Sequence, residues 1–166
     1  MHMTNEARVR LTQVAAGRPL RVGIVSANWG MVAHLPAWRA NGVEVAAVCT
    51  AREETARAAA ERYGLERAYW DYRDLAADPT LVIVDVGTRP DLRGDMVLAA
   101  LAQGKHVFAA ANFAADIAAA REMRGAARQA GTVCMLDSTL AVIPAHRHIA
   151  HAIREAEIGM PDSFST

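Results

Sequence analysis

The residues best placed to do chemistry follow the first apolar run of the chain, in the stretch RVGIVSANWGMVAHLPAW. An apolar run, a short turn and a helical segment in this order are typical of a loop that binds phosphate with the amides at the helix start. The candidate residues are Ser26, Asn28, Trp29 and Gly30. Ser26 and Asn28 stand where such a loop has glycines, which allow the tight turn and the close approach of a pyrophosphate. Because Gly30 and the helix N-terminus remain, we expect weakened phosphate binding; the alternative is a plain turn that binds nothing.

A second candidate group lies at the end of the next apolar run, VEVAAVCT, where Thr50 is followed closely by Arg52. In NAD-binding proteins an acidic residue at this point accepts hydrogen bonds from the ribose hydroxyls. A hydroxyl and an arginine suit a 2′-phosphate instead, because a guanidinium pairs with phosphate through charge-assisted hydrogen bonds. If a dinucleotide binds, we therefore expect NADP rather than NAD; alternatively, Arg52 is a solvated residue at a helix start. Thr88 and Arg89, after LVIVDVGT, complete the set of expected cofactor contacts.

Apolar runs rich in β-branched residues alternate along the chain with alanine-rich helical runs. The expected strands span residues 20–25, 43–50, 68–70, 81–88, 106–109 and 132–136, and the expected helices 31–40, 53–63, 72–76, 91–103, 116–130 and 144–157. Strands that are buried on both faces and joined by helical crossovers are typical of a parallel sheet covered on both sides. The prediction is an α/β fold with a doubly wound, mainly parallel, six-stranded Rossmann-type sheet and helices on both faces. Ligands of such sheets bind at the carboxyl ends of the strands.

Length and composition limit the classes of partner. The chain has 166 residues, enough for one domain with its own core, and eighteen basic residues balance eighteen acidic ones. This balance gives no reason to expect nucleic acid or a membrane surface as a partner, and no apolar run approaches the ~18 residues of a membrane span. Cys49 and Cys134 lie in apolar runs typical of buried strands, and the N-terminus lacks a signal-peptide pattern. We therefore expect a reducing, cytoplasmic setting.

Three stretches of the chain, in a fixed order, carry a family resemblance. They are RVGIVSANWGMVAHLPAWRANGVEVAAVCTAREETARAAAERYG, VDVGTRPDLRGDMVLAALAQGKHVFAAANFAAD and AEIG, which together extend from about Arg21 to Gly159. Their order and spacing resemble the nucleotide-binding domain of the Gfo/Idh/MocA oxidoreductases, and such a series is more specific than one glycine pattern. The resemblance implies an NAD- or NADP-dependent dehydrogenase or reductase of sugars, cyclic polyols or related small molecules. It also implies a second α/β domain that holds the substrate and mediates oligomerisation.

The resemblance also shows where a catalytic residue is missing. In the family, the strand after GKHV runs into a Glu-Lys-Pro signature whose lysine lies beside the nicotinamide and the substrate. The matching residues here are Ala110, Ala111 and Asn112. A methyl group cannot donate or accept a proton, so we expect no catalytic residue in this chain. Lys105, the only lysine in the sequence, precedes the strand and is an unsuitable replacement.

The expected organisation has three parts: an N-terminal extension over residues 1–19, the Rossmann-type domain over 20–160, and a tail over 161–166. The tail resembles the start of the family's second domain. The leading hypothesis is a cofactor-binding domain that does not transfer hydride alone and meets a small-molecule substrate only with a partner domain. The alternative is a non-catalytic interaction or scaffold protein, pairing with itself or with a full-length homologue. A third possibility is an ordinary dehydrogenase in truncated form.

The remaining candidates favour structural roles. His146, His148 and His151 lack the spacing of a metal-binding pair with a nearby carboxylate, so no metal site is expected. His34, in the first expected helix, suits either packing and capping or contact with a ligand. Asp116 precedes an alanine-rich run and is typical of a helix cap.

Overall fold

The computed structural model describes residues 20–26, 28–139 and 143–157. The chain divides into two compact units, the first ending at Leu136 and the second beginning at Asp137. The first unit contains the sheet and its helices, and the second contains helix α8 (Pro144–Arg154). The expected N-terminal extension, residues 1–19, and the expected tail, residues 161–166, lie outside the described residues.

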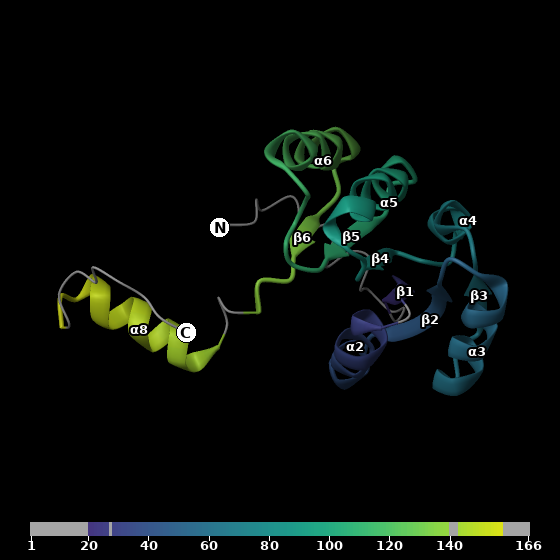
Figure 1. Ribbon diagram of the computed structural model, residues 1–166, viewed down its shortest axis with the longest axis horizontal. Coiled ribbons are helices and arrows are strands. Elements are labelled where there is room, and N and C mark those ends of the chain that lie inside the picture. The colour runs from purple at the N-terminus through teal and green to yellow at the C-terminus, as the bar shows by residue number, and fades with distance from the viewer. Residues whose placement is uncertain (1–19, 27, 140–142, 158–166) are drawn as a thin grey trace. The chain divides into compact units, whose positions relative to one another are not determined.

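A six-stranded sheet forms the centre of the first unit (Figure 1). Its strands are β1 (Arg21–Val25), β2 (Glu44–Cys49), β3 (Arg67–Tyr69), β4 (Ile83–Val86), β5 (His106–Ala109) and β6 (Cys134–Leu136). They lie in the order β3-β2-β1-β4-β5-β6, and every neighbouring pair is parallel. The direction of winding reverses between β1 and β4, which makes this point the topological switch of the sheet. The predicted doubly wound parallel sheet is confirmed.

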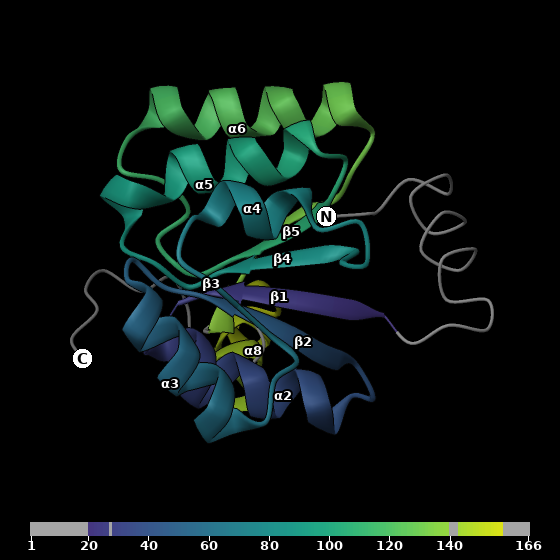
Figure 2. The same cartoon turned by 90° about the vertical axis from the view of Figure 1, so that its right-hand side faces the viewer.

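Helices cover both faces of this sheet. They are η1 (Gly30–His34), α2 (Leu35–Ala40), α3 (Glu53–Tyr63), α4 (Tyr72–Ala77), α5 (Pro90–Ala102) and α6 (Ile117–Ala130). Figure 2 shows α4, α5 and α6 on one face and α2 and α3 on the other. Each helix follows a strand and returns the chain to the amino edge of the sheet, so the loops that follow the strands gather at the opposite, carboxyl edge.

Local sequence explains where several helices begin and end. Gly64 and Gly131 follow α3 and α6 with φ of 62° and 63°, in the left-handed region that glycine adopts at low cost. At the start of α6, the Asp116 carboxylate accepts a hydrogen bond of 2.8 Å from the Ala119 amide. The predicted role of Asp116 as a helix cap is confirmed.

Two apolar layers hold the helices to the sheet. The larger layer lies between the sheet and α4, α5 and α6, with Val86, Val97 and Met123 among its fully buried members. The smaller layer, with Ile24 and Met31, lies between the sheet and the helices η1, α2 and α3. Both faces of the central strands are therefore buried, which accounts for their continuous apolar runs.

The first helix differs from the regular α-helix expected over residues 31–40. It begins with η1, a π-helical turn closed by a hydrogen bond from the Leu35 amide to the Gly30 carbonyl, and α2 continues from there. The wider turn lies directly before Pro36. A proline ring in a regular helix collides with the carbonyl four residues earlier, here that of Val32, and the wider turn relieves this contact.

A network of polar side chains fixes the connection between α4 and β4. Asp78 is 5% exposed, and its carboxylate accepts hydrogen bonds from Arg67 at 2.5 Å and from the Tyr69 hydroxyl at 3.0 Å. The amide and hydroxyl of Thr80 donate to its other oxygen at 2.9 and 2.8 Å. Burial by itself raises the pKa of Asp78, but the bonds from Arg67 and Thr80 outweigh it and lower the pKa to about 2.

This low pKa predicts how acid affects stability. The pKa of Asp78 is lower in the folded chain than the ~3.9 of an unfolded aspartate. The contribution of the ionised carboxylate to the free energy of unfolding is therefore complete above about pH 5 and is lost as the pH falls through 2. We expect Asp78→Asn to lower the free energy of unfolding at neutral pH by about 2 kcal/mol. Urea denaturation between neutral and acid pH measures this. Asp74→Asn, a change at an exposed position of α4, is the matched control; an equal loss in both variants would contradict the prediction.

Candidate functional site

The structure places the predicted cofactor contacts at the carboxyl ends of three adjacent strands. Ser26, Asn28, Trp29 and Gly30 follow β1, Thr50 and Arg52 follow β2, and Thr88 and Arg89 follow β4. Since β2, β1 and β4 are neighbours and run in parallel, these residues share one edge of the sheet at its topological switch point. This is the place where doubly wound sheets bind their ligands.

Ser26 forms hydrogen bonds inside the loop after β1. Its side chain is buried, and its hydroxyl oxygen accepts hydrogen bonds from the amides of Asn28 at 3.2 Å and Gly30 at 3.3 Å. The carbonyl of Asn28 accepts in turn from the amides of Met31 and Val32, at 2.9 and 3.0 Å. The amides of Asn28, Gly30, Met31 and Val32 are therefore bonded within the loop itself.

Gly30 lets the helix start lie directly on β1. A Cβ atom at Gly30 would lie 2.7 Å from the side chain of Ile24 and 2.9 Å from Cβ of Ser26, closer than real contacts permit. This is the role of the last glycine of a dinucleotide-binding loop, which allows close packing of helix and strand.

The loop is also one residue shorter than the motif it resembles, a feature that the sequence analysis missed. Ser26 and Gly30 are four positions apart, whereas the first and last glycines of G-x-G-x-x-G are five apart. The π-helical turn η1, which follows this short loop, contains one residue more than an α-helical turn would. Counting residues between the two positions would have revealed the difference.

The segment after β2 presents a hydroxyl and an exposed guanidinium. The Thr50 hydroxyl lies 2.6 Å from that of Thr55 and donates to the Arg52 carbonyl at 2.9 Å. The Arg52 side chain is exposed and has no hydrogen-bond or ion-pair partner among the described residues. The first acidic residue after the strand, Glu53, accepts hydrogen bonds of 2.9 and 2.7 Å from Arg57. The segment therefore offers an unpaired positive charge and an acid that is already engaged.

The segment after β4 is held by a buried arginine. Arg93, in α5, is 1% exposed, and its guanidinium donates to the carbonyls of Thr88 and Asn112. Burial lowers the pKa of Arg93. It fastens the loop after β4 to the loop after β5, and it was not singled out from the sequence. Its spacing of four and eight residues from the buried Val97 and Leu101 places it on the core face of α5, which was the available signal.

The two predicted residues after β4 make local contacts of their own. The Thr88 hydroxyl donates to the sulfur of Met96 at 3.4 Å. Arg89 is exposed and forms an ion pair of 3.0 Å with Asp91 at the start of α5. Arg89 is therefore less available to an anion than Arg52.

A buried polar cluster lies beneath this edge. The Asp85 side chain, in β4, is completely buried, and the indole N–H of Trp38 donates to its Oδ2 at 2.7 Å. Nδ1 of His34 lies 2.9 Å from Oδ1 and 3.0 Å from Oδ2. Phe108 packs edge-on against both rings, with centroid distances of 5.2 and 5.4 Å. Of the two expectations for His34, the structure supports packing; Asp85, a single acid within the apolar run LVIVDVGT, was missed.

The polar cluster yields a prediction about stability. In His34→Leu, the buried Asp85 carboxyl group loses one of its two partners, and we expect the free energy of unfolding to fall by about 3 kcal/mol. Adding Asp85→Val removes the carboxyl group that His34→Leu left with one partner fewer. The double variant should therefore recover at least half of the lost free energy of unfolding. Urea denaturation of the two single variants and the double variant measures the coupling. Losses that simply add would contradict the prediction.

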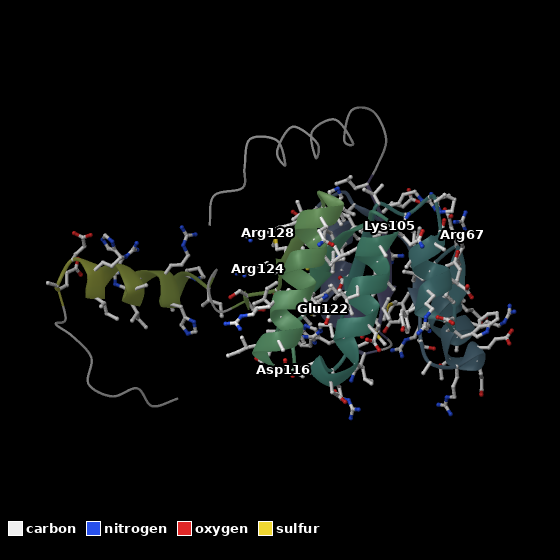
Figure 3. The ribbon with its side chains drawn as sticks, turned by 90° about the horizontal axis from the view of Figure 1, so that it is seen from above. Arg67, Lys105, Asp116, Glu122, Arg124 and Arg128 are labelled. Atoms are coloured by element: carbon white, nitrogen blue, oxygen red, sulfur yellow. The ribbon has the colours of Figure 1, made fainter. Side chains whose placement is uncertain are left out.

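The three residues directly after β5 carry no group that transfers protons. Ala110 is buried, Ala111 and Asn112 are exposed, and the Asn112 carbonyl is bonded by Arg93. Lys105 does not replace the missing lysine, because its amino group donates to the backbone carbonyls of Asp78 and Leu81 at 2.7 and 2.8 Å. Figure 3 shows Lys105 at the edge of the sheet opposite to Asp116, which follows β5 on the carboxyl side.

Other chemistries find little support in the described part of the chain. Burial raises the pKa of the Cys49 thiol to about 12 and that of Cys134 to about 11, and neither forms a disulfide. Neither cysteine is therefore a thiolate nucleophile at neutral pH. Among the described residues, no three His, Cys, Asp or Glu side chains gather as metal ligands, and no helix is long and apolar enough to cross a membrane.

Comparison with protein families and known sequences agrees with this geometry. Residues 20–138 match the Gfo/Idh/MocA family, described as an oxidoreductase family with an NAD-binding Rossmann fold. A D-apiose dehydrogenase from Paraburkholderia graminis is 33% identical over 129 residues, which are 77% of this chain and 34% of that protein. A 1,5-anhydro-D-fructose reductase from Ensifer adhaerens is 33% identical over 142 residues, 81% of this chain and 43% of that protein.

Solved structures of oxidoreductases also superimpose on this chain. An NAD-binding oxidoreductase from Klebsiella pneumoniae superimposes with a TM-score of 0.76 at 30% identity, covering 85% of this chain and 40% of that one. A 3-ketoreductase from Actinomadura kijaniata, in complex with NADP and TDP-benzene, gives a TM-score of 0.78 at 29% identity. The superposition covers 86% of this chain and 44% of that one. The chain thus spans less than half the length of each of these relatives.

Proposed function

Because this chain belongs to the Gfo/Idh/MocA family of oxidoreductases, we propose that the carboxyl edge of its sheet binds NADP(H) in preference to NAD(H). We further propose that the chain does not transfer hydride alone. The observation that carries the cofactor preference is the exposed guanidinium of Arg52, which has no partner among the described residues. It lies just after β2, where a Rossmann-type sheet holds the adenosine ribose.

The surroundings of Arg52 support a 2′-phosphate at this position. No acidic residue occupies positions 50–52, the first three after β2. Glu53, the nearest acid in sequence, forms an ion pair with Arg57. It is therefore less available to accept a hydrogen bond from a ribose hydroxyl. A guanidinium can form two parallel hydrogen bonds with a phosphate, which makes the pairing strong and directional. The A. kijaniata 3-ketoreductase, whose structure contains NADP, adds support by similarity.

The pyrophosphate of the cofactor would lie over the loop after β1. Gly30 brings the helix start close to β1, and the positive end of the helix favours an anion there. Trp29 is 52% exposed beside this loop and is suited to cover part of a bound dinucleotide.

The absence of hydride transfer follows from the segment after β5. A family member places a lysine beside the nicotinamide, and Ala111 holds that position here. Without a proton donor or acceptor, a bound nicotinamide lacks the group that would complete reduction of a carbonyl to an alcohol. The chain would then act as the cofactor-holding part of a reaction whose acid–base chemistry comes from elsewhere.

The cofactor preference can be tested by titration. We expect NADPH to quench the fluorescence of Trp29 in a saturable manner and to bind more tightly than NADH, with Trp29→Phe identifying the responding tryptophan. Arg52→Ala should weaken NADPH binding about tenfold, because a charge-assisted hydrogen bond is lost, and leave NADH binding unchanged. Arg62→Ala is the matched control, since it removes the same charge from the opposite end of α3.

Two results would count against the proposal. Equal effects of Arg52→Ala on NADPH and NADH would contradict the role of Arg52. Binding of neither nucleotide at millimolar concentration would overturn cofactor binding and favour the alternative of an interaction protein. For that alternative, the exposed apolar side chains of Ile117 and Met135 are the residues through which the chain could pair.

The missing acid–base chemistry can be tested by turnover. With NADPH and 1,5-anhydro-D-fructose, the substrate in the name of one relative, we expect no oxidation of NADPH above the uncatalysed rate. Absorbance of the reduced nicotinamide measures this directly. Turnover by the purified chain that requires a higher NADPH concentration in Arg52→Ala would contradict the proposal.

A further inference from the structure

The loop after β1 already contains a hydrogen-bond acceptor for its own backbone amides. The Ser26 hydroxyl accepts hydrogen bonds from the amides of Asn28 and Gly30, at 3.2 and 3.3 Å. Amides at this position, between a strand and a helix start, are the donors that hold a phosphate in a dinucleotide-binding loop. A serine oxygen and a phosphate oxygen are both acceptors, so they require the same N–H groups.

Packing holds the Ser26 side chain in this position. It is 6% exposed, and a Cβ atom at Gly30 would lie 2.9 Å from the Ser26 Cβ. A Cβ atom at Gly87 would lie 3.0 Å from the same carbon and 3.2 Å from the Ser26 hydroxyl oxygen. The Ser26 side chain is therefore packed closely against the backbone of both glycines.

Two further amides of the helix start are also engaged. Those of Met31 and Val32 donate to the Asn28 carbonyl within the same turn. A phosphate approaching this loop would therefore find the amides of Asn28, Gly30, Met31 and Val32 already bonded inside the loop.

We propose that the Ser26 hydroxyl is an internal competitor of the cofactor pyrophosphate for the amides of Asn28 and Gly30. This inference rests on the proposed binding of NADP(H). It assigns the weakening of phosphate binding to a hydrogen-bonding atom rather than to the steric bulk of a side chain in place of glycine. Ser26 is thus a residue that sets cofactor affinity by acting through the backbone.

Removing the hydroxyl distinguishes competition from a merely structural role. In Ser26→Ala, both amides lose their internal acceptor, and we expect NADPH and inorganic pyrophosphate each to bind about tenfold more tightly. Ser26→Gly should give the same direction of change and covers the case in which the alanine variant folds poorly. Ser138→Ala, the same substitution in the exposed segment after β6, is the matched control and should bind as the unmodified chain does.

Amide hydrogen exchange provides a readout that needs no ligand. In Ser26→Ala, exchange at the amides of Asn28 and Gly30 should accelerate about tenfold, since each loses a hydrogen-bond acceptor. Unchanged exchange would overturn the proposal, because the hydroxyl would then not engage these amides in solution.

The binding results separate this proposal from the proposed function. Equal NADPH affinity of the unmodified chain and Ser26→Ala, or weaker binding by the variant, would overturn the competitor role and leave NADP(H) binding intact. If no form binds NADPH, the proposed function is overturned. In that case, binding of pyrophosphate by Ser26→Ala but not by the unmodified chain would still support competition between the hydroxyl and a phosphate. If neither form binds pyrophosphate, both proposals are overturned.

Discussion

The parallel pairing of β1 with both β2 and β4 is the constraint on which the candidate site depends. It brings the ends of three strands to one edge, so that segments distant in sequence place the loop after β1, the Arg52 guanidinium and the loop after β4 beside one another. The close approach of Gly30 to Ile24 then sets the helix start directly over the end of β1. No side chain chosen for chemistry would be correctly placed without this backbone arrangement.

Polar groups inside the fold fasten the loops that this arrangement creates. Asp85 connects η1 and α2 to β4 through His34 and Trp38, and Arg93 connects the loop after β4 to the loop after β5. Burying such groups is costly unless each finds partners, so these contacts specify one arrangement of the loops rather than add much to stability. The loops at the candidate site are accordingly held in place by buried side chains.

Alternation of apolar and alanine-rich runs was sufficient to predict the sheet, its helices and the edge at which the candidate residues lie. This worked because the periodicity of each element and the capping residues, such as Gly64 and Asp116, are local signals. The contact of His34 with Asp85 joins residues 51 positions apart, and that of Arg93 with Asn112 joins residues 19 apart. Such partners depend on tertiary packing, which no local pattern specifies. Ser26 was recognised as a departure from glycine, but the hydrogen bonds that its hydroxyl accepts depend on the path of the folded loop.

The burial of Lys105 has a consequence for the surface as a whole. This is the only lysine of the sequence, and its amino group donates to two backbone carbonyls at the amino edge of the sheet. Every other basic side chain apart from histidine is an arginine, whose charge persists at any physiological pH. Acylating enzymes that neutralise lysine would therefore find no exposed side-chain amine on the folded domain, and the positive charge that faces solvent is permanent.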